Sequence, residues 1–331
     1  MSQIKATIIA DSSCNGSRIT TYEIEVHRFI WSEFMTHRQF SRNAASSRAI
    51  PIDTQLKMVE ESPATPVHWG LNQSGMQASN EHASPASCEW AWKKAATNSM
   101  LCATMLKDLG LHKQLVNRVL EPFQMIKAVV TATEYDNFFY LRNHKDAQPE
   151  IAELAKLMYD ARCKSTPNDL KAGEWHLPYV KTFRSNYGGV SELEDHIIYT
   201  TNYVEWGDKD DTATWNELTL EDAIKVSASC CAQVSYRKQD ESLEKALKIW
   251  DMLVTMKPVH ASPFEHQASP MLRTNVTISE NRNDPTVPAK WQDGVTHFDK
   301  EAKGWSANFK GWIQHRQLID NNVCNNYEET K

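Results

Sequence analysis

The chain has 331 residues, a net charge of −6 and a hydrophobic fraction of 41%. This composition can supply a sizeable core, which excludes wholesale disorder, and the negative charge provides no overall positive field for nucleic acid. No apolar run approaches the about 20 residues of a membrane span, and the first residues lack the apolar stretch of a signal peptide. The seven cysteines show no CxxC spacing. We therefore expect a cytoplasmic globular protein that binds no metal, nucleic acid or membrane.

The first half of the chain combines one alternating segment with several helical ones. Residues 20–26 alternate apolar and polar side chains, which predicts a half-buried strand, and a short apolar helix is expected over 29–35. Residues 62–87 are rich in Ser, Pro, Gly and Asn without an apolar period, which indicates a long loop. The same criteria predict helices at 89–109, from 113 to a break at Pro122, at 125–144 and at 150–162.

The second half is less regular. Residues 163–218 have a mixed pattern, and Thr219–Asp222 resembles a capping box in front of a helix. Residues 241–256 form the clearest helical pattern, which weakens after Pro270 and returns at 305–319. The helical period is common and the strand period rare, so the predicted class is helix-rich α/β or α+β. We divide the chain at 1–160, 161–218 and 219–331, within one compact domain.

The densest group of polar donors lies at residues 36–48, which read THRQFSRNAASSR. An arginine can bind a phosphate with two parallel hydrogen bonds, and serine hydroxyls add short neutral donors. If the segment ends in a turn, Ser46, Ser47 and Arg48 can point toward one anion. A solvated polar helix face explains the same pattern, and on this pattern alone it is favoured.

Two other segments are candidates for a site. Arg142 ends the aromatic segment NFFYLR that starts at Asn137, and such an arginine either lies at the edge of a core or over a ligand. The segment HASPFEH, with Ser262 and Glu265, predicts a rigid turn and a short helix with an acidic first turn. The cysteines have no electropositive setting, so we expect no cysteine nucleophile.

Taken together, these segments resemble one family, the flavin-dependent thymidylate synthases. The family hallmark is Arg-His-Arg, seven residues, a Ser and an Arg two positions later, and His37, Arg38, Ser46 and Arg48 fit this frame. Residues 137–151 are similar to the family helix Asn-Phe-x-x-Leu-Arg with its following Ala-Gln-x-Glu-Ile. Shorter similarities are NRVLEP with Arg118, AQVSY with Ser235, and SPFEH with Ser262 and Glu265.

The chain also departs from the family pattern. Glu33, Thr36 and Ala44 stand where the family has Gln, Arg and Glu, and the segments with Ser235 and Ser262 follow the hallmark motif instead of preceding it. The motif order therefore resembles a circular permutation. Residues 163–218 and 271–331 have no family counterpart that we can identify, and the role of the loop 62–87 is open. Candidates to replace the missing donors are Gln314, His315 and Arg316.

The resemblance implies a mainly antiparallel sheet wrapped by helices and a homotetramer with sites shared between subunits. It implies conversion of dUMP to dTMP, with 5,10-methylenetetrahydrofolate as carbon donor, FAD as hydride carrier, NADPH as reductant and no protein nucleophile. In that scheme Arg142 is the catalytic residue and also binds dUMP, because it stabilises charge on the uracil ring. The other implied dUMP ligands are Ser46, Ser47, Arg48 and Arg118. The implied FAD contacts are His37, Arg38, Asn137, Ser235, Ser262 and Glu265.

Two further functions remain open at this point. A related flavoenzyme could modify deoxyuridylate differently, for example by installing a hydroxymethyl group, and the departures at Glu33, Thr36 and Ala44 keep this alternative open. A non-catalytic nucleotide-binding protein would use Arg38, Arg42 and Arg48 without any redox role. The colour of the purified protein separates the two classes, because a flavoprotein is yellow.

Overall fold

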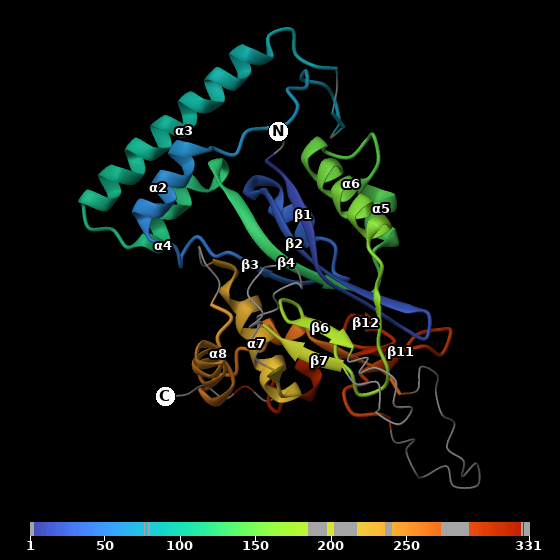
Figure 1. Ribbon diagram of the computed structural model, residues 1–331. Coiled ribbons are helices and arrows are strands. Elements are labelled where there is room, and N and C mark those ends of the chain that lie inside the picture. Colours follow the sequence, from blue (N-terminus) through green and yellow to red (C-terminus); the bar gives the residue numbers. More distant parts are fainter. Residues whose placement is uncertain are drawn as a thin grey trace, which may run out of the picture.

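The computed structural model describes residues 3–75, 77–78, 80–184, 197–201, 217–235, 240–272, 291–325 and 327 (Figure 1). It has a mixed α/β fold built mainly on antiparallel sheets, as expected from the sequence. Large parts of 163–218 and 271–331 lie outside the described residues, as does the side chain of Ser235. Among the helices described, none is long and apolar enough to cross a membrane.

The central sheet has five strands in the order β3-β4-β2-β1-β5. Its long strands β1, β2 and β4 pair antiparallel, whereas β5 adds to β1 in parallel. Strand β2 contains the predicted strand 20–26, which is confirmed. The strands are β1 Lys5–Cys14, β2 Ser17–His27, β3 Ser41–Ala44, β4 Met125–Ala132 and β5 Asn168–Asp169.

The prediction of a helix over 125–144 is wrong. Its first part is strand β4, which lies between β2 and β3, and only Asp136–Arg142 is helical, as α5. Ala128 and Val130 of β4 pack into the main core, while Val129 packs on the other face against Cys231 and Val234. Because both faces are buried, β4 has an almost continuous apolar sequence, and a continuous apolar run does not distinguish a strand from a helix.

Helices cover both faces of this sheet. Figure 1 shows α5 and α6 above it and α7 and α8 below it, with α2 and α3 extending to one side. The predicted helices 89–109 and 150–162 are confirmed as α3 and α6. The helices are α1 Trp31–Met35, α2 Ile52–Glu61, α3 Pro85–Asp108, α4 Lys113–Val116, α6 Pro149–Lys164, α7 Leu220–Ala232 and α8 Leu243–Trp250.

Several predicted elements are shorter than expected. The helix predicted from residue 113 ends at Val116 and continues as a 3-10 turn, and the one predicted at 241–256 ends at Trp250 and continues as a π turn. The predicted cap of α7 is present, since the Thr219 side chain accepts a hydrogen bond from the Asp222 N–H. The turns are η1 Arg28–Ile30, η2 Asn117–Phe123, η3 Gln233–Ser235, η4 Asp251–Thr255, η5 Ser262–Glu265 and η6 His315–Leu318.

Short strands make up the rest of the second half. They form a sheet β6-β7-β8, a sheet β10-β11-β12 and a pair β13-β9. The pattern that returns at 305–319 therefore corresponds to strands and the turn η6. The strands are β6 Lys181–Arg184, β7 Ile197–Thr200, β8 Glu217–Leu218, β9 Ala268–Pro270, β10 His297–Phe298, β11 Gly304–Ser306, β12 Phe309–Lys310 and β13 Trp312–Gln314.

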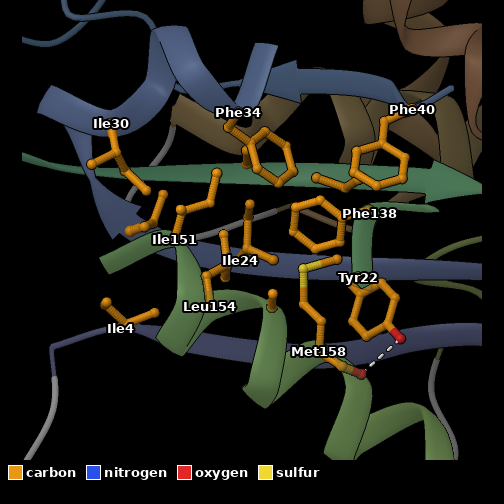
Figure 2. Close-up of a cluster of buried hydrophobic side chains, with 14 of the residues drawn as sticks. Ile4, Tyr22, Ile24, Ile30, Phe34, Phe40, Phe138, Ile151, Leu154 and Met158 are labelled. Carbon is orange, nitrogen blue, oxygen red and sulfur yellow. Dashed lines mark hydrogen bonds between the residues drawn. The ribbon is translucent and has the colours of Figure 1, made fainter. Parts of the chain in front are cut away.

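The main core fixes α5 and α6 against the sheet (Figure 2). Ile24 from the sheet, Phe34 from α1, Phe138 from α5 and Met158 from α6 are each at most 2% exposed. The hydroxyl of Tyr22 donates a hydrogen bond to the Met158 carbonyl at 2.9 Å, which satisfies the one polar atom that this large ring brings into the core. Phe138 lies one helical turn before Arg142, so this core also positions that arginine.

Candidate active site

A cavity of about 610 Å³ lies between the segment 36–40, which precedes β3, and helix α5. Its walls bring together residues that are far apart in the sequence, including Trp305 from β11. The half-buried ring of Trp305 provides flat apolar surface, whereas Phe40 and Phe138 are 3% and 2% exposed and support the wall from the main core. The polar groups come from Thr36, His37, Arg38, Gln39, Glu134, Asp136, Asn137 and Arg142. Four of the residues predicted for the site, His37, Arg38, Asn137 and Arg142, therefore line one cavity.

The side chains of Arg142 and His37 are in direct contact in this wall. The Arg142 Nε–H donates a hydrogen bond to His37 Nε2 at 2.9 Å, so this nitrogen of the imidazole carries no proton. Burial, together with the positive charges of Arg142 and Arg42, lowers the pKa of His37 to about 4. Among the described residues Arg142 makes no other hydrogen bond, so its two terminal NH₂ groups remain available to a ligand.

We expect an NMR titration of the histidine ring signals to show His37 neutral at pH 6, with protonation near pH 4. Because the pKa of His37 in the folded protein lies below the ordinary value, the ring becomes charged and repels Arg142 only in acid. The variant Arg142→Gln removes a neighbouring positive charge and should raise the His37 pKa. A His37 that titrates near 6.5 in the wild-type protein would contradict this arrangement.

A second polar cluster lies around the bend that follows β3. The Ser47 hydroxyl donates to Glu121 Oε1 at 2.6 Å, and Arg118 donates to the same oxygen at 2.9 Å. The Asn117 side-chain N–H donates to the Ser47 carbonyl at 2.7 Å and holds the bend in place. Arg48 is exposed and forms no ion pair with any described residue. Of the four predicted dUMP ligands, Ser47 and Arg118 are thus bonded to Glu121, and Ser46 and Arg48 flank Ser47 in the chain.

Strand β3 separates this cluster from the cavity. The cavity lies before the strand and the bend follows it, and five residues of extended chain from Phe40 to Ala45 span about 16 Å. Within one chain, Arg142 and the bend at 46–48 therefore do not share a pocket. A site that uses both groups on one pyrimidine nucleotide requires a second subunit.

The predicted contacts from the second half lie beside β3. The Ser262 hydroxyl donates to Asn43 Oδ1 at 2.6 Å, and Glu265 is paired with Arg316. Gln314 is buried, and its side-chain N–H donates to the Ser41 hydroxyl at 3.2 Å. Neither Ser262 nor Glu265 lines the cavity.

The candidates Gln314, His315 and Arg316 hold turn η5 and its surroundings against β3. His315 is buried between the rings of Trp250 and Phe264, and burial lowers its pKa to about 4. Arg316 lies against the Glu265 carboxylate. These three side chains therefore contact other protein groups and do not line the cavity.

Sequence reasoning missed three groups that the structure places at these sites. Glu121 organises the bend and is recognisable only by its spacing of three residues from Arg118. Glu134 and Asp136 line the cavity from the connection between β4 and α5. Trp305 reaches the cavity from the far end of the chain, and no local pattern in the sequence indicates this.

Comparison with known proteins agrees with the motifs. Residues 18–168 match the family model described as thymidylate synthase complementing protein. This stretch contains the segment 36–48, Arg118 and the segment 137–151, but neither Ser235 nor residues 262–266. The match therefore does not test the permuted order of the motifs, which stays a prediction. A search of curated proteins found no match.

The chain is also similar to solved structures at low identity. The UMP/dUMP methylase PolB from Streptomyces cacaoi bound with 5-Br UMP is 16% identical, with 50% of this chain and 90% of that chain covered and a TM-score of 0.41. The flavin-dependent thymidylate synthase ThyX from Helicobacter pylori complexed with FAD and dUMP is 18% identical, with 44% and 67% covered and a TM-score of 0.31. Residues 18–168, a little under half of the chain, are thus similar to the thymidylate synthase complementing protein family.

Proposed function

We propose that this protein is a flavin-dependent enzyme that converts dUMP to dTMP, with 5,10-methylenetetrahydrofolate as carbon donor and NADPH as reductant. One observation carries the proposal. Arg142, held by a neutral His37, lies in the wall of an aromatic cavity, and both residues belong to the stretch that matches the thymidylate synthase complementing family.

In this proposal Arg142 acts on the uracil ring of dUMP. Its terminal N–H groups would donate to the ring oxygen at C2 and stabilise negative charge on N3 and O2, which makes C5 a better nucleophile. The neutral His37 fixes the guanidinium without neutralising its charge. The arginine is thus oriented before substrate binds, and such preorganised donors are effective in catalysis.

The cavity walls fit a flavin. The half-buried ring of Trp305 offers apolar surface to an isoalloxazine, and Phe40 and Phe138 support the wall from the core. Arg38 and Asn137 offer donors to the polar edge of the flavin. When bound, FAD supplies hydride-transfer chemistry. The chain's contribution is to orient the ring, to place positive charge beside it and to limit the access of water. Turn η5 and Ser235 would complete the flavin site from a neighbouring subunit.

The cluster around Glu121 would bind the phosphate of dUMP across a subunit interface, in a homotetramer. Arg48 is exposed, and Ser47 and Arg118 are both bonded to Glu121 in this structure. A phosphate that approaches this bend would compete with Glu121 for the Ser47 and Arg118 donors. The distance between this cluster and Arg142 within one chain supports a shared site.

We expect Arg48→Ala to raise the KM for dUMP about tenfold with little change in kcat, because a hydrogen bond between charged groups contributes about this factor to binding. The exposed Lys57→Ala on α2 is the matched control and should leave KM unchanged. Steady-state kinetics with varied dUMP provides the measurement. An unchanged KM for Arg48→Ala would remove this residue from the phosphate site.

The proposed function is tested by the absorbance of the purified protein. A flavoprotein shows the flavin bands and bleaches when NADPH is added anaerobically, and subsequent addition of 5,10-methylenetetrahydrofolate with dUMP should yield dTMP. A hydroxymethylated product would show that the protein is a related deoxyuridylate-modifying enzyme and not a thymidylate synthase. A colourless protein that binds no added FAD would overturn the proposal.

A further inference from the structure

A second cavity adjoins the candidate active site. It has a volume of about 350 Å³, and Glu134 and Asp136 belong to the walls of both cavities. Gly304 lines the second cavity and the next residue, Trp305, lines the first. The two cavities therefore meet along the connection between β4 and α5 and along β11.

Two hairpins that are far apart in the sequence enclose the second cavity. The tip of the β1–β2 hairpin contacts the β11–β12 hairpin, and Figure 1 shows the two side by side. The Ser17 hydroxyl donates to the Lys310 carbonyl at 2.9 Å, and the Lys310 N–H donates to the Thr133 hydroxyl at 3.0 Å. Gly311 has a φ of +75°, and a Cβ there would lie 3.1 Å from the Ser17 hydroxyl, so this close approach requires glycine.

Charge is distributed unevenly along the two cavities. The second cavity has the basic residues Arg18, Arg162, Lys303 and Lys310 in its walls, and none of these lines the first cavity. Asp11 pairs with Arg18, and Asp299 pairs with Lys310 at 3.1 Å. Arg162 has no carboxylate partner among the described residues; it donates to the Thr20 hydroxyl and lies 5.2 Å from the centre of the Tyr135 ring.

The three zones differ in the chemistry that they offer to a ligand. Aromatic rings and the Arg142–His37 pair line the first cavity, where a flat heterocycle can stack. The carboxyl groups of Glu134 and Asp136 lie where the cavities meet, and such groups accept hydrogen bonds from hydroxyls. The basic residues Arg162 and Lys303 line the second cavity and not the first, and a phosphate in the second cavity would be stabilised by them.

We propose that the two cavities form one extended site for a flavin nucleotide, a ligand with a flat ring, a hydroxylated linker and a phosphate, and that the β11–β12 hairpin with Lys303 just before it provides the phosphate end. This proposal rests on the proposed function and refines it, because the phosphate of dUMP is there assigned to the separate cluster around Glu121. The hairpin lies outside the stretch that matches the family model. It would be a specificity element that this chain adds to the shared site.

The test uses pairs of ligands that differ only in the phosphate. The affinities of the full-length protein for riboflavin and FMN, and for deoxyuridine and dUMP, are measured by fluorescence quenching and isothermal titration calorimetry. Lys303→Glu reverses a charge at the phosphate end, and Lys300→Glu is the matched control in the same connection between β10 and β11, since Lys300 is exposed and lines neither cavity. Circular dichroism verifies that both variants fold.

We expect Lys303→Glu to weaken binding of FMN about tenfold or more, with no change for riboflavin. Binding of deoxyuridine and dUMP should be unchanged, because the phosphate of dUMP is assigned to the Glu121 cluster. Equal losses for FMN and riboflavin, or no loss for FMN relative to Lys300→Glu, would overturn the extended site. If the wild-type protein binds neither flavin nor dUMP, both the extended site and the proposed function fail. If the wild-type protein binds them and Lys303→Glu does not change the preference for FMN over riboflavin, only the extended site fails.

Discussion

Replacing Arg142 by alanine is expected to lower the rate of dTMP formation by about 100- to 1000-fold, the usual cost of removing one preorganised donor from a transition state. The flavin absorbance should be largely retained, because the aromatic walls of the cavity and Arg38 are unchanged. Single-turnover measurements that compare flavin bleaching by NADPH with product formation would separate loss of chemistry from loss of cofactor.

Two variants make this prediction specific. Arg142→Lys keeps a positive charge but has no Nε–H in the geometry that reaches His37, so it should recover little of the lost rate. Lys145→Ala changes an exposed cation just after α5 and should behave as the wild type. Wild-type rates for Arg142→Ala would show that this residue is not catalytic.

Lowering the pH from 7 to 5 is expected to reduce the free energy of unfolding by about 4 kcal/mol through two buried histidines. Ser12, His176, Thr21, Thr131 and His266 form a continuous buried chain of hydrogen bonds of 2.7–2.9 Å between the sheet strands and the segment after η5. His176 and His266 are 1% and 0% exposed, and burial lowers the pKa of each from 6.5 to about 3.

The sign of the effect follows from proton binding. Below pH 6.5 the unfolded chain takes up protons on both imidazoles, whereas the folded chain does so only near pH 3, so stability falls as the pH falls through this range. At pH 5 the difference of about 1.5 pH units corresponds to about 2 kcal/mol for each histidine. Urea unfolding at the two pH values measures this loss.

His176→Gln isolates one of these contributions. Glutamine keeps a donor and an acceptor for Ser12 and Thr21 but does not titrate. The variant should therefore show only about half of the pH-dependent loss of stability that the two histidines cause in the wild-type protein. It should also be less stable at pH 7, because glutamine does not fill the space of the ring. An unchanged dependence on pH in this variant would show that His176 is not protonated on unfolding.

The elements that the sequence predicts correctly are those with one buried and one exposed side. Helix α6 has its stripe of Ile151, Leu154 and Met158, and β2 alternates, so each shows a clear period. Strand β4 is buried on both faces, so its sequence does not alternate between apolar and polar residues. The strands β10–β13 have only two or three residues each, too few for a period to be recognised.

The site shows a similar division. The resemblance to the flavin-dependent thymidylate synthases assigned His37, Arg38, Asn137 and Arg142 to a site, and the structure brings these four residues to one cavity. The contact between Arg142 and His37 joins residues 105 positions apart and depends on how α5 packs against the sheet. Trp305 and Lys303 reach the two cavities only because the β11–β12 hairpin folds back onto the β1–β2 hairpin. Such a long-range contact leaves no local pattern.

The most direct test of the account is the fate of a labelled carbon. The purified protein is incubated with FAD, NADPH, dUMP and 5,10-methylenetetrahydrofolate labelled with ¹³C in the methylene group, and the nucleotide is analysed by mass spectrometry and NMR. The account predicts dTMP with the label in its C5 methyl group, and almost none with Arg142→Ala. Recovery of unmodified dUMP from a wild-type protein that has bound FAD and is reduced by NADPH would contradict it.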